Sequence, residues 1–505
     1  MKPLKCILLL WALLVALFSC TPDGGVEDDT QSPDPVEPIL FRSFTILKEN
    51  NPDAVLASVQ VPTGETTIDH HTPLLIDRSS LVVDFVTDIP ATVYVGDVKQ
   101  VSGQTVNDFT SPVTYRMVGV EGDENECVVS LSSTGLPVVV INTPSSQSIP
   151  PKTEDWLEGT ELCIYDAEGE LVYDDEVEIR GRGNSTWTFP KKPYALKLNE
   201  KASILGMPAH KRWVLLANWL DRTLLRNDVA FHIASLSGLE WTPRGEFVEV
   251  ILNGRHRGCY YLCEQIKVDK NRVNIAELSD ADPSGGYLLE LDVYYDEVFK
   301  FTSARWNFPY MFKDPDEVTD AQFAYMEGYV AEMEEALYDD ERFAAREYTD
   351  YLDVDSFVDF WLVFELTMNS EPLHPKSVYM HKDRGGVMKA GPVWDFDWET
   401  FVPYKASSYV VKDALYYARL FEDAAFVQRV KERWAELKPA FEGVPEYIGA
   451  LAEHIAHSEA INHQLWPIDV VVNRDEHLSF EEAVSLMRKS YENKLRWLGK
   501  QIEGM

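Results

Sequence analysis

The chain shows an N-terminal stretch of short β-rich runs before any helical pattern begins. Residues 39–133 contain runs rich in Val, Ile, Thr, Tyr and Phe, separated by Gly, Pro, Asp and Asn. Several such runs with no helical period between them predict a small all-β sandwich. The predicted strands include residues 44–46, 81–86, 92–95, 113–118 and 127–131.

A second and larger unit, 138–505, mixes strand and helix patterns and predicts an α+β fold. Asn253-Gly254 within EFVEVILNGRHRGCYYLCEQI is a strong hairpin signal. A helix is predicted from Asp221 to Gly238 on its capping signals, and apolar periodicity makes the region from about 412 helical. The other predicted elements are strands at 177–180, 194–198 and 213–217, helices at 319–339 and 354–368, and a hairpin at 377–394 that turns at 384–386.

The stretch GPVWDFDWET at 391–400 alternates aromatic and acidic residues. In a strand, its acids would project from one face with the aromatic rings packed behind them. The acids are Asp395, Asp397 and Glu399, and the rings are Trp394, Phe396 and Trp398.

Three like charges on one face repel one another unless they are neutralised. A hard divalent cation would neutralise them, with Asn369 and Glu371 as further oxygen ligands. Salt bridges to Lys376 or Lys389 are the alternative.

The N-terminus has the pattern of a secretory signal. Lys2 and Lys5 precede a continuous apolar run at 7–18, which is too short to cross a bilayer. LFSC at 17–20 resembles the bacterial lipobox, so residues 1–19 are predicted to be removed and Cys20 to be lipidated. The acidic, Pro-rich and Gly-rich stretch at 20–38 predicts a disordered tether. The lipid on Cys20 would then be the only membrane contact of an extracytoplasmic, outer-membrane protein, at the cell surface.

The charge composition of the chain limits the kinds of partner that it can bind. The chain has 83 acidic and 46 basic side chains and a net charge of −37, which argues against nucleic-acid binding. Cys127, Cys163, Cys259 and Cys263 are predicted to be buried thiols, although the sequence leaves a Cys127–Cys163 bridge open.

Two basic motifs are candidates for anion binding. In IRGRGNSTW at 179–187, Arg182 and Ser185 lie in a glycine-containing loop, and Lys197 follows on the next predicted strand. The amides of such a loop and a strand lysine suit phosphate, but RGRG is also compatible with a plain tight turn and a solvated lysine. Arg222 and Arg226, four residues apart on the predicted helix, either meet an anion together or pair with nearby acids.

The order of the motifs resembles that of the CotH, or spore-coat protein H, family of atypical secreted kinases. RGRGNSTW, FPKKPYALKL, LGMP, the segment around NWLDRTLLRN, NGRHRGCYYLCEQI, VYMHKD and WDFDWE occur in this order across about 138–405. The β-rich unit similarly resembles the immunoglobulin-like modules that precede secreted bacterial enzymes, as a spacer or as a ligand-binding module.

The resemblance implies a divergent protein-kinase-like fold that uses ATP with Mg²⁺ or Mn²⁺ to phosphorylate a protein on Ser. It places the nucleotide phosphates at Arg182, Ser185, Lys197 and Arg226. It also implies a metal at Asp395, with Asp397 and Asn369 in support, and makes Glu371 and Asp395 the catalytic pair.

Two departures from the family pattern keep other functions open. Glu371 stands where the family's N-x-D motif has its catalytic Asp, and Ser377 replaces an Asn before the hairpin Tyr. The leading hypothesis is a lipid-anchored kinase acting on a protein or a glycan. The alternatives are an inactive pseudokinase that acts as a surface-binding or scaffold module, and a glycosidase using paired acids.

Overall fold

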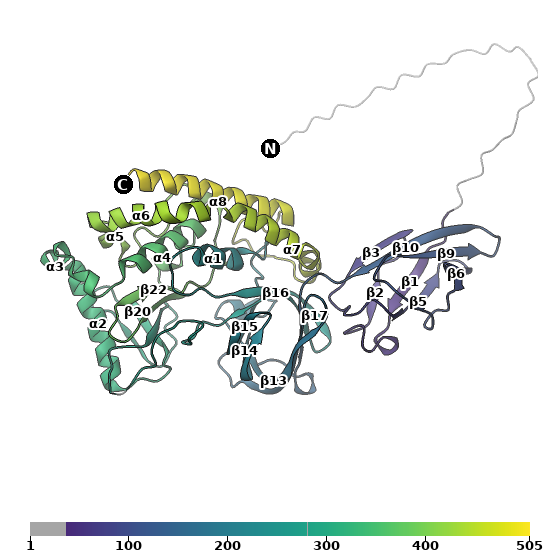
Figure 1. The fold of residues 1–505 in the computed structure, drawn as a ribbon, viewed down its shortest axis with the longest axis horizontal. Coiled ribbons are helices and arrows are strands. Elements are labelled where there is room, and N and C mark those ends of the chain that lie inside the picture. Colours follow the sequence, from purple (N-terminus) through teal and green to yellow (C-terminus); the bar gives the residue numbers. More distant parts are fainter. Residues whose placement is uncertain (1–36, 280) are drawn as a thin grey trace, which may run out of the picture.

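The computed structural model describes residues 37–505 except residue 280, so the predicted signal, Cys20 and most of the tether lie outside the described residues. A β-rich region forms one end of the molecule, a barrel follows it, and a sheet covered by helices forms the other end (Figure 1). Within the described part of the chain, no helix is both long enough and apolar enough to cross a membrane.

The N-terminal region consists of β-sheets around one core, in which Phe41, Phe44 and Tyr115 pack edge to face. All five predicted runs contain strands. One sheet has the order β2-β1-β5, another β3-β10-β9-β6-β7, and β4 pairs with β8. The bounds are β1 Phe41–Ile46, β2 Val59–Val61, β3 Thr67–His71, β4 Leu81–Val82, β5 Asp84–Thr87, β6 Ala91–Val95, β7 Val98–Lys99, β8 Val106–Asn107, β9 Val113–Gly119 and β10 Glu124–Ser132.

Seven strands then form a closed barrel in the order β11-β12-β13-β14-β15-β17-β16, with a core that includes Leu196, Trp213 and Tyr260. The parallel pairing of β11 with β16 closes it, a feature that the sequence patterns do not predict. Asn253 and Gly254 both have positive φ in the predicted hairpin turn. The bounds are β11 Val138–Asn142, β12 Leu157–Tyr165, β13 Leu171–Gly181, β14 Tyr194–Ile204, β15 Met207–Leu216, β16 Gly245–Leu252 and β17 Arg255–Glu264.

Helix α1 (Arg226–Ser235) is shorter than the predicted 221–238. Asp221 does not cap it directly, because its buried carboxylate accepts the backbone N–H groups of Thr223 and Arg226 and so holds the preceding residues in turns. Leu224, at φ 61°, interrupts helical geometry before Arg226. The left-handed residue therefore delays the start of the helix.

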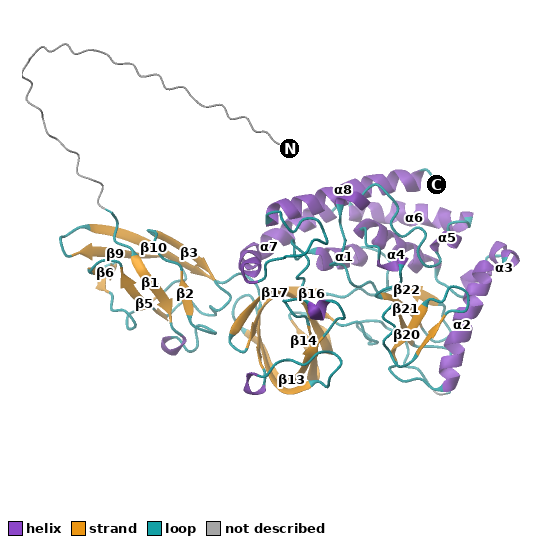
Figure 2. Ribbon diagram, turned by 180° about the vertical axis from the view of Figure 1, so that it is seen from behind, coloured by secondary structure: helices purple, strands orange, loops and turns teal. Residues whose placement is uncertain are grey.

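The second sheet has the order β19-β20-β18-β21-β22, and three α-helices lie in the chain between β20 and β21 (Figure 2). The predicted helices at 319–339 and 354–368 and the predicted hairpin are present as α2, α4 and β21-β22. The bounds are β18 Tyr287–Leu291, β19 Lys300–Thr302, β20 Pro309–Asp314, β21 Val378–Lys382, β22 Met388–Ala390, α2 Asp320–Tyr338, α3 Asp340–Ala344 and α4 Val354–Thr367.

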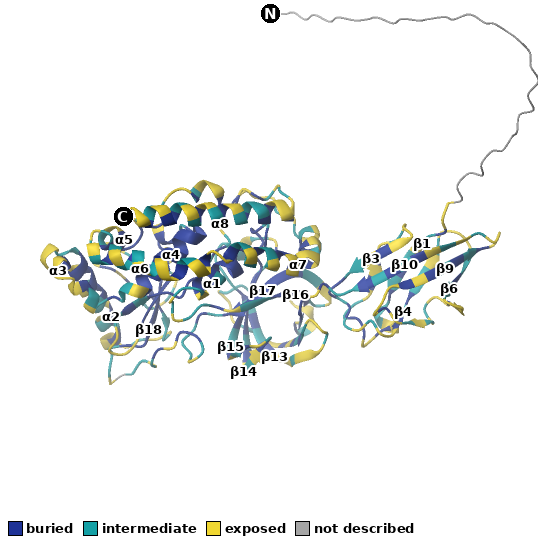
Figure 3. Cartoon of the chain, turned by 45° about the horizontal axis from the view of Figure 1, so that its top comes forward, coloured by how far each residue is buried: buried dark blue, intermediate teal, exposed yellow. Residues whose placement is uncertain are grey.

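The C-terminal region is helical, as predicted, and covers α1 and α4. Figure 3 shows that α4 is buried almost throughout, whereas α8 has an exposed outer face. The helices are α5 Tyr417–Leu420, α6 Ala424–Phe441, α7 Val444–Leu465 and α8 Phe480–Glu503. All four cysteines are free thiols, so the Cys127–Cys163 bridge is absent, but only Cys127, Cys259 and Cys263 are buried as predicted, whereas Cys163 is partly exposed.

The β-rich region touches the rest of the chain through an aromatic contact. His71, at the end of β3, stacks on His457 of α7 with ring centroids 3.6 Å apart. Gly169, in the β12-β13 turn, lies against Ile76, so close that a Cβ on this glycine would be 2.8 Å from the Ile76 carbonyl oxygen. These contacts join the β-rich region to α7 and to the barrel.

Candidate active site

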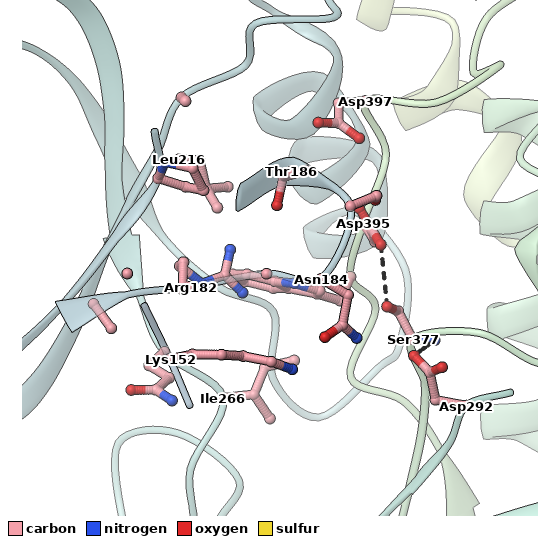
Figure 4. Close-up of a pocket in the computed structure, with 18 of the residues that line it drawn as sticks. Lys152, Arg182, Asn184, Thr186, Leu216, Ile266, Asp292, Ser377, Asp395 and Asp397 are labelled. Atoms are coloured by element: carbon pink, nitrogen blue, oxygen red, sulfur yellow. Dashed lines mark hydrogen bonds between the residues drawn. The ribbon is translucent and has the colours of Figure 1, made fainter. Parts of the chain in front are cut away.

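A cavity of about 430 Å³ lies between the barrel and the second sheet (Figure 4). One wall comes from β13, the loop that follows it and β15. The opposite wall comes from the ends of β18 and β21 and from residues 393–401, which we call the acid loop. The cavity therefore brings together the glycine motif and the acidic motif, which are about 200 residues apart in the sequence.

The acid loop is not the predicted strand. Asp395, Glu399 and Phe401 have φ values of 71°, 47° and 57°, which break an extended backbone. Trp394 and Phe396 do pack inward, against Phe231 of α1.

The three acids of the loop consequently do not share one face. Asp395 and Asp397 line the cavity, whereas Glu399 pairs with Lys405 at 3.3 Å and Trp398 is 44% exposed. The alternative of salt bridges is confirmed in part, because Lys376 pairs with Glu371 and lines the same cavity as Asp395, whereas Lys389 pairs with Glu240. The loop thus presents two carboxylates to the cavity.

The barrel wall carries three arginines on tryptophan rings. The guanidinium groups of Arg180 and Arg212 lie 4.3 and 4.8 Å from the Trp156 ring, and that of Arg182 lies 5.2 Å from the Trp394 ring. Within the described chain, none of the three forms a salt bridge. Burial lowers the pKa of Arg180 and Arg212, and the positive charge of Arg180 adds to this at Arg212. The charges of nearby acids oppose it, Glu297 at Arg180 and Glu178 and Asp316 at Arg212. In so acidic a chain, unpaired cations mark this wall as a site for an anion.

The loop at residues 181–187, which we call the glycine loop, has a conformation that requires glycine at two positions. Gly183 has φ 77°, and a Cβ there would lie 1.9 Å from Oγ1 of Thr186. A Cβ on Gly181 would meet the Trp187 ring at 2.4 Å. Ser185, in the same loop, lines the cavity as the motif predicts. The loop can therefore approach a ligand closely with its backbone.

A model of the CotH kinase protein family matches residues 179–498, well over half of the chain. The chain belongs to the CotH kinase family. The match begins within β13, ends within α8, and includes the glycine loop, the acid loop and all the predicted site residues except Cys20. No curated protein matches the chain.

Two basic residues predicted at the phosphates of a CotH kinase do not line the cavity. Lys197 pairs with Glu178 on the neighbouring strand at 2.6 Å. Arg226 is 2% exposed and pairs with Asp221 and Asp475, while Arg222 pairs with Glu459. The reading in which Arg222 and Arg226 pair with acids is the one that the structure shows.

Like Lys197 and Arg226, Asn369 does not line the cavity. Its Nδ2 donates to the Asp395 carbonyl oxygen at 2.9 Å and to Oγ1 of Thr400 at 3.1 Å. Its Oδ1 accepts the backbone N–H of Glu371 at 2.8 Å. Asn369 therefore orients the acid loop, and its oxygen is already engaged.

Glu371 lies behind the cavity surface. It is 6% exposed, its Oε1 lies 3.5 Å from Nζ of Lys376, and its Oε2 has no hydrogen-bond partner in the described chain. Burial, and then the charge of Asp395, raise the pKa of Glu371 to about 7. Burial, and then the charge of Asp395, likewise raise the pKa of Asp397.

Ser377 links Asp395 to Asp292, a residue that the sequence analysis missed. Oγ of Ser377 donates to Oδ2 of Asp395 at 3.1 Å, and the Ser377 backbone N–H donates to Oδ2 of Asp292 at 3.2 Å (Figure 4). Asp292 lines the cavity directly after β18. The feature of the sequence that could have indicated Asp292 is its position directly after a strand.

Asp395 and Asp397 are carboxylates of the cavity wall that fit a divalent cation. Among the described residues, no group of three or more His, Cys, Asp and Glu side chains is arranged to hold a metal ion. Asp395 and Asp397 supply two carboxylates, and Mg²⁺ commonly uses one or two carboxylates together with substrate phosphates and water.

Proposed function

We propose that this CotH family member is a kinase that transfers the γ-phosphoryl group of ATP to a Ser hydroxyl of a protein substrate. The observation that carries the proposal is the opposition of two walls across one cavity. One wall has arginines that form no salt bridge within the described chain, and the other has the carboxylates of Asp292, Asp395 and Asp397. Phosphoryl transfer needs both, because the phosphates must be positioned and their charge neutralised.

The barrel wall would hold the phosphates. Arg180, Arg182 and Arg212 offer guanidinium donors without breaking existing salt bridges, and the Ser185 loop adds backbone and hydroxyl donors. Under this proposal the barrel and the second sheet are the two lobes of a divergent kinase-like fold.

The acid loop would hold Mg²⁺ or Mn²⁺ through Asp395 and Asp397. When bound, the metal neutralises phosphate charge. Asp395 already accepts a hydrogen bond from the Ser377 hydroxyl, so its carboxylate can orient an acceptor hydroxyl in the same way. Glu371, with its pKa raised to about 7, would take up the proton in this region.

Calorimetric titration of the mature protein with ATP and Mn²⁺ tests the nucleotide site. We expect metal-dependent binding that is lost in Asp395→Ala and weakened in Arg182→Ala. No binding by the parent protein under any metal condition would refute the proposal.

A pseudokinase with a surface-binding or scaffold role is the second candidate. It is favoured by Glu371, which lies behind the cavity surface and is paired with Lys376. Nucleotide binding without transfer to any protein or glycan, unchanged in Glu371→Gln, would support it.

We also propose that lipid on Cys20 anchors the chain to the outer membrane, extracytoplasmically. The basic, apolar and LFSC segments at the N-terminus support this proposal. Fatty-acid labelling of cells that express the parent or Cys20→Ser would test it, since only the parent should be labelled and retained in the membrane fraction.

A further inference from the structure

The acid loop belongs to no sheet, so its backbone is held by side-chain hydrogen bonds and by the Phe401 N–H, which donates to the Thr367 carbonyl oxygen at 2.8 Å. Asn369, after α4, donates to the Asp395 carbonyl oxygen at 2.9 Å. Arg226, at the start of α1, donates to the Thr400 carbonyl oxygen at 2.9 Å. A third donor comes from the connection between α7 and α8, where Nδ2 of Asn473 donates to the Asp397 carbonyl oxygen at 2.9 Å.

Asn473 is itself firmly placed. It is 1% exposed, its Nδ2 also donates to the Leu220 carbonyl oxygen at 3.1 Å, and its backbone N–H donates to Glu476 at 2.6 Å. Two residues later, Asp475 pairs with Arg226. The segment 472–476 therefore reaches the acid loop twice, directly through Asn473 and indirectly through Asp475 and Arg226.

We propose that Asn473 is a positioning residue for Asp397, an inference that rests on the function proposed above. A bond to the carbonyl oxygen of a residue fixes its peptide plane and so restricts where its side chain points. Asp397 and Asp395 are two residues apart and both line the cavity, so a rotation of the Asp397 peptide plane would move its carboxylate relative to that of Asp395. The connection between α7 and α8 thus becomes part of the metal-binding wall.

The test compares Asn473→Ala and Asn473→Asp with the parent in two measurements. Hydrogen–deuterium exchange over residues 393–401 reports the loop itself, without any ligand. Calorimetry with ATP, in the presence and absence of Mn²⁺, reports the metal-dependent part of nucleotide binding. Asn51→Ala is the matched control, because Asn51 is also buried and donates to two carbonyl oxygens, those of Leu47 and Val82.

We expect faster exchange confined to residues 393–401 and a loss of about 10- to 100-fold in Mn²⁺-dependent ATP affinity, the usual effect of removing a group that supports a metal ligand. Binding of ATP without metal should remain as in the parent, and Asn51→Ala should change neither measurement at this site.

Unchanged exchange and affinity in Asn473→Ala would overturn the inference, and so would faster exchange throughout the chain, which indicates a general loss of stability. If the parent does not bind ATP, the proposed function fails separately. The exchange experiment then decides whether Asn473 fixes the loop.

Discussion

Lys197 and Arg212 are paired across β14 and β15, yet only Arg212 lines the cavity. Lys197 pairs with Glu178, whereas Arg212 lies on the Trp156 ring and forms no salt bridge with any described residue. Of these two cations on adjacent strands, Arg212 can therefore contact a ligand in the cavity, whereas Lys197 is held outside it by Glu178.

We expect Arg212→Ala to weaken ATP binding by about tenfold, because a charged hydrogen bond is lost. Lys197→Ala should bind ATP as the parent does, since it removes only a pair at the strand surface. Calorimetry on the two variants checks this difference. Equal losses would mean that Lys197 reaches the nucleotide after all.

Gly183 offers a test of the glycine loop with a matched control. Gly183 and Gly206 both have φ 77°, so alanine costs about 1 kcal/mol of backbone strain at either position. Only at Gly183 would the Cβ clash, with Oγ1 of Thr186, whereas at Gly206 nothing lies within 4 Å.

Gly183→Ala should therefore lose ATP binding, while Gly206→Ala should lose only a small amount of thermal stability. Thermal unfolding and calorimetry on both variants check this. Normal ATP affinity in Gly183→Ala would show that the loop conformation is not needed.

The stacked pair of His71 and His457 predicts a pH-dependent contact between the β-rich region and α7. Burial, and then His457, lower the pKa of His71 below its ordinary 6.5, with Asp69 opposing this. The folded state therefore favours neutral His71, so its contribution to stability is present above about pH 6.5 and is lost as the pH falls below that value.

Limited proteolysis at the junction, at pH 7.5 and pH 5, should show faster cleavage of the parent at the lower pH. His457→Phe keeps an aromatic ring that cannot be protonated, and it should show a smaller difference between the two pH values. The same pH dependence in this variant would assign the effect to another group.

Lys494 and Glu365 form a fully buried ion pair between α8 and α4 at 2.6 Å. Lys494→Met should lower the free energy of unfolding by about 3 kcal/mol or more, because Glu365 keeps a buried charge without its partner. Lys438→Met removes an exposed pair at 4.0 Å, and its effect should be below about 1 kcal/mol. Chemical denaturation of both variants measures the contrast. Similar small losses would mean that the Val410 and Val411 N–H groups suffice for Glu365.

Local signals explain which parts of the fold the sequence predicts. The Asn253-Gly254 hairpin and helices α2 and α4 follow from turn chemistry and apolar periodicity over neighbouring residues. Barrel closure depends on the pairing of Val138 with Glu249, more than 100 residues away, and no local pattern encodes it.

The same limit applies to the candidate site. Arg182, Ser185 and Asp395 lie inside motifs and were predicted at the site. Arg212 and Asp292 carry no motif, and only the folded strands bring them to the cavity. Asn369 and Arg226 were predicted near the ligand, but they support the acid loop from behind.

The closed barrel also determines how the cavity can change its width. A sheet without free edges resists bending, because every strand is bonded on both sides. Arg180 and Arg212 lie on strands of this barrel, so we expect their side of the cavity to keep its shape when a ligand binds. The opposite side is the acid loop, which belongs to no sheet and is held by a small set of hydrogen bonds. We therefore expect changes in the width of the cavity to come from movement of this loop.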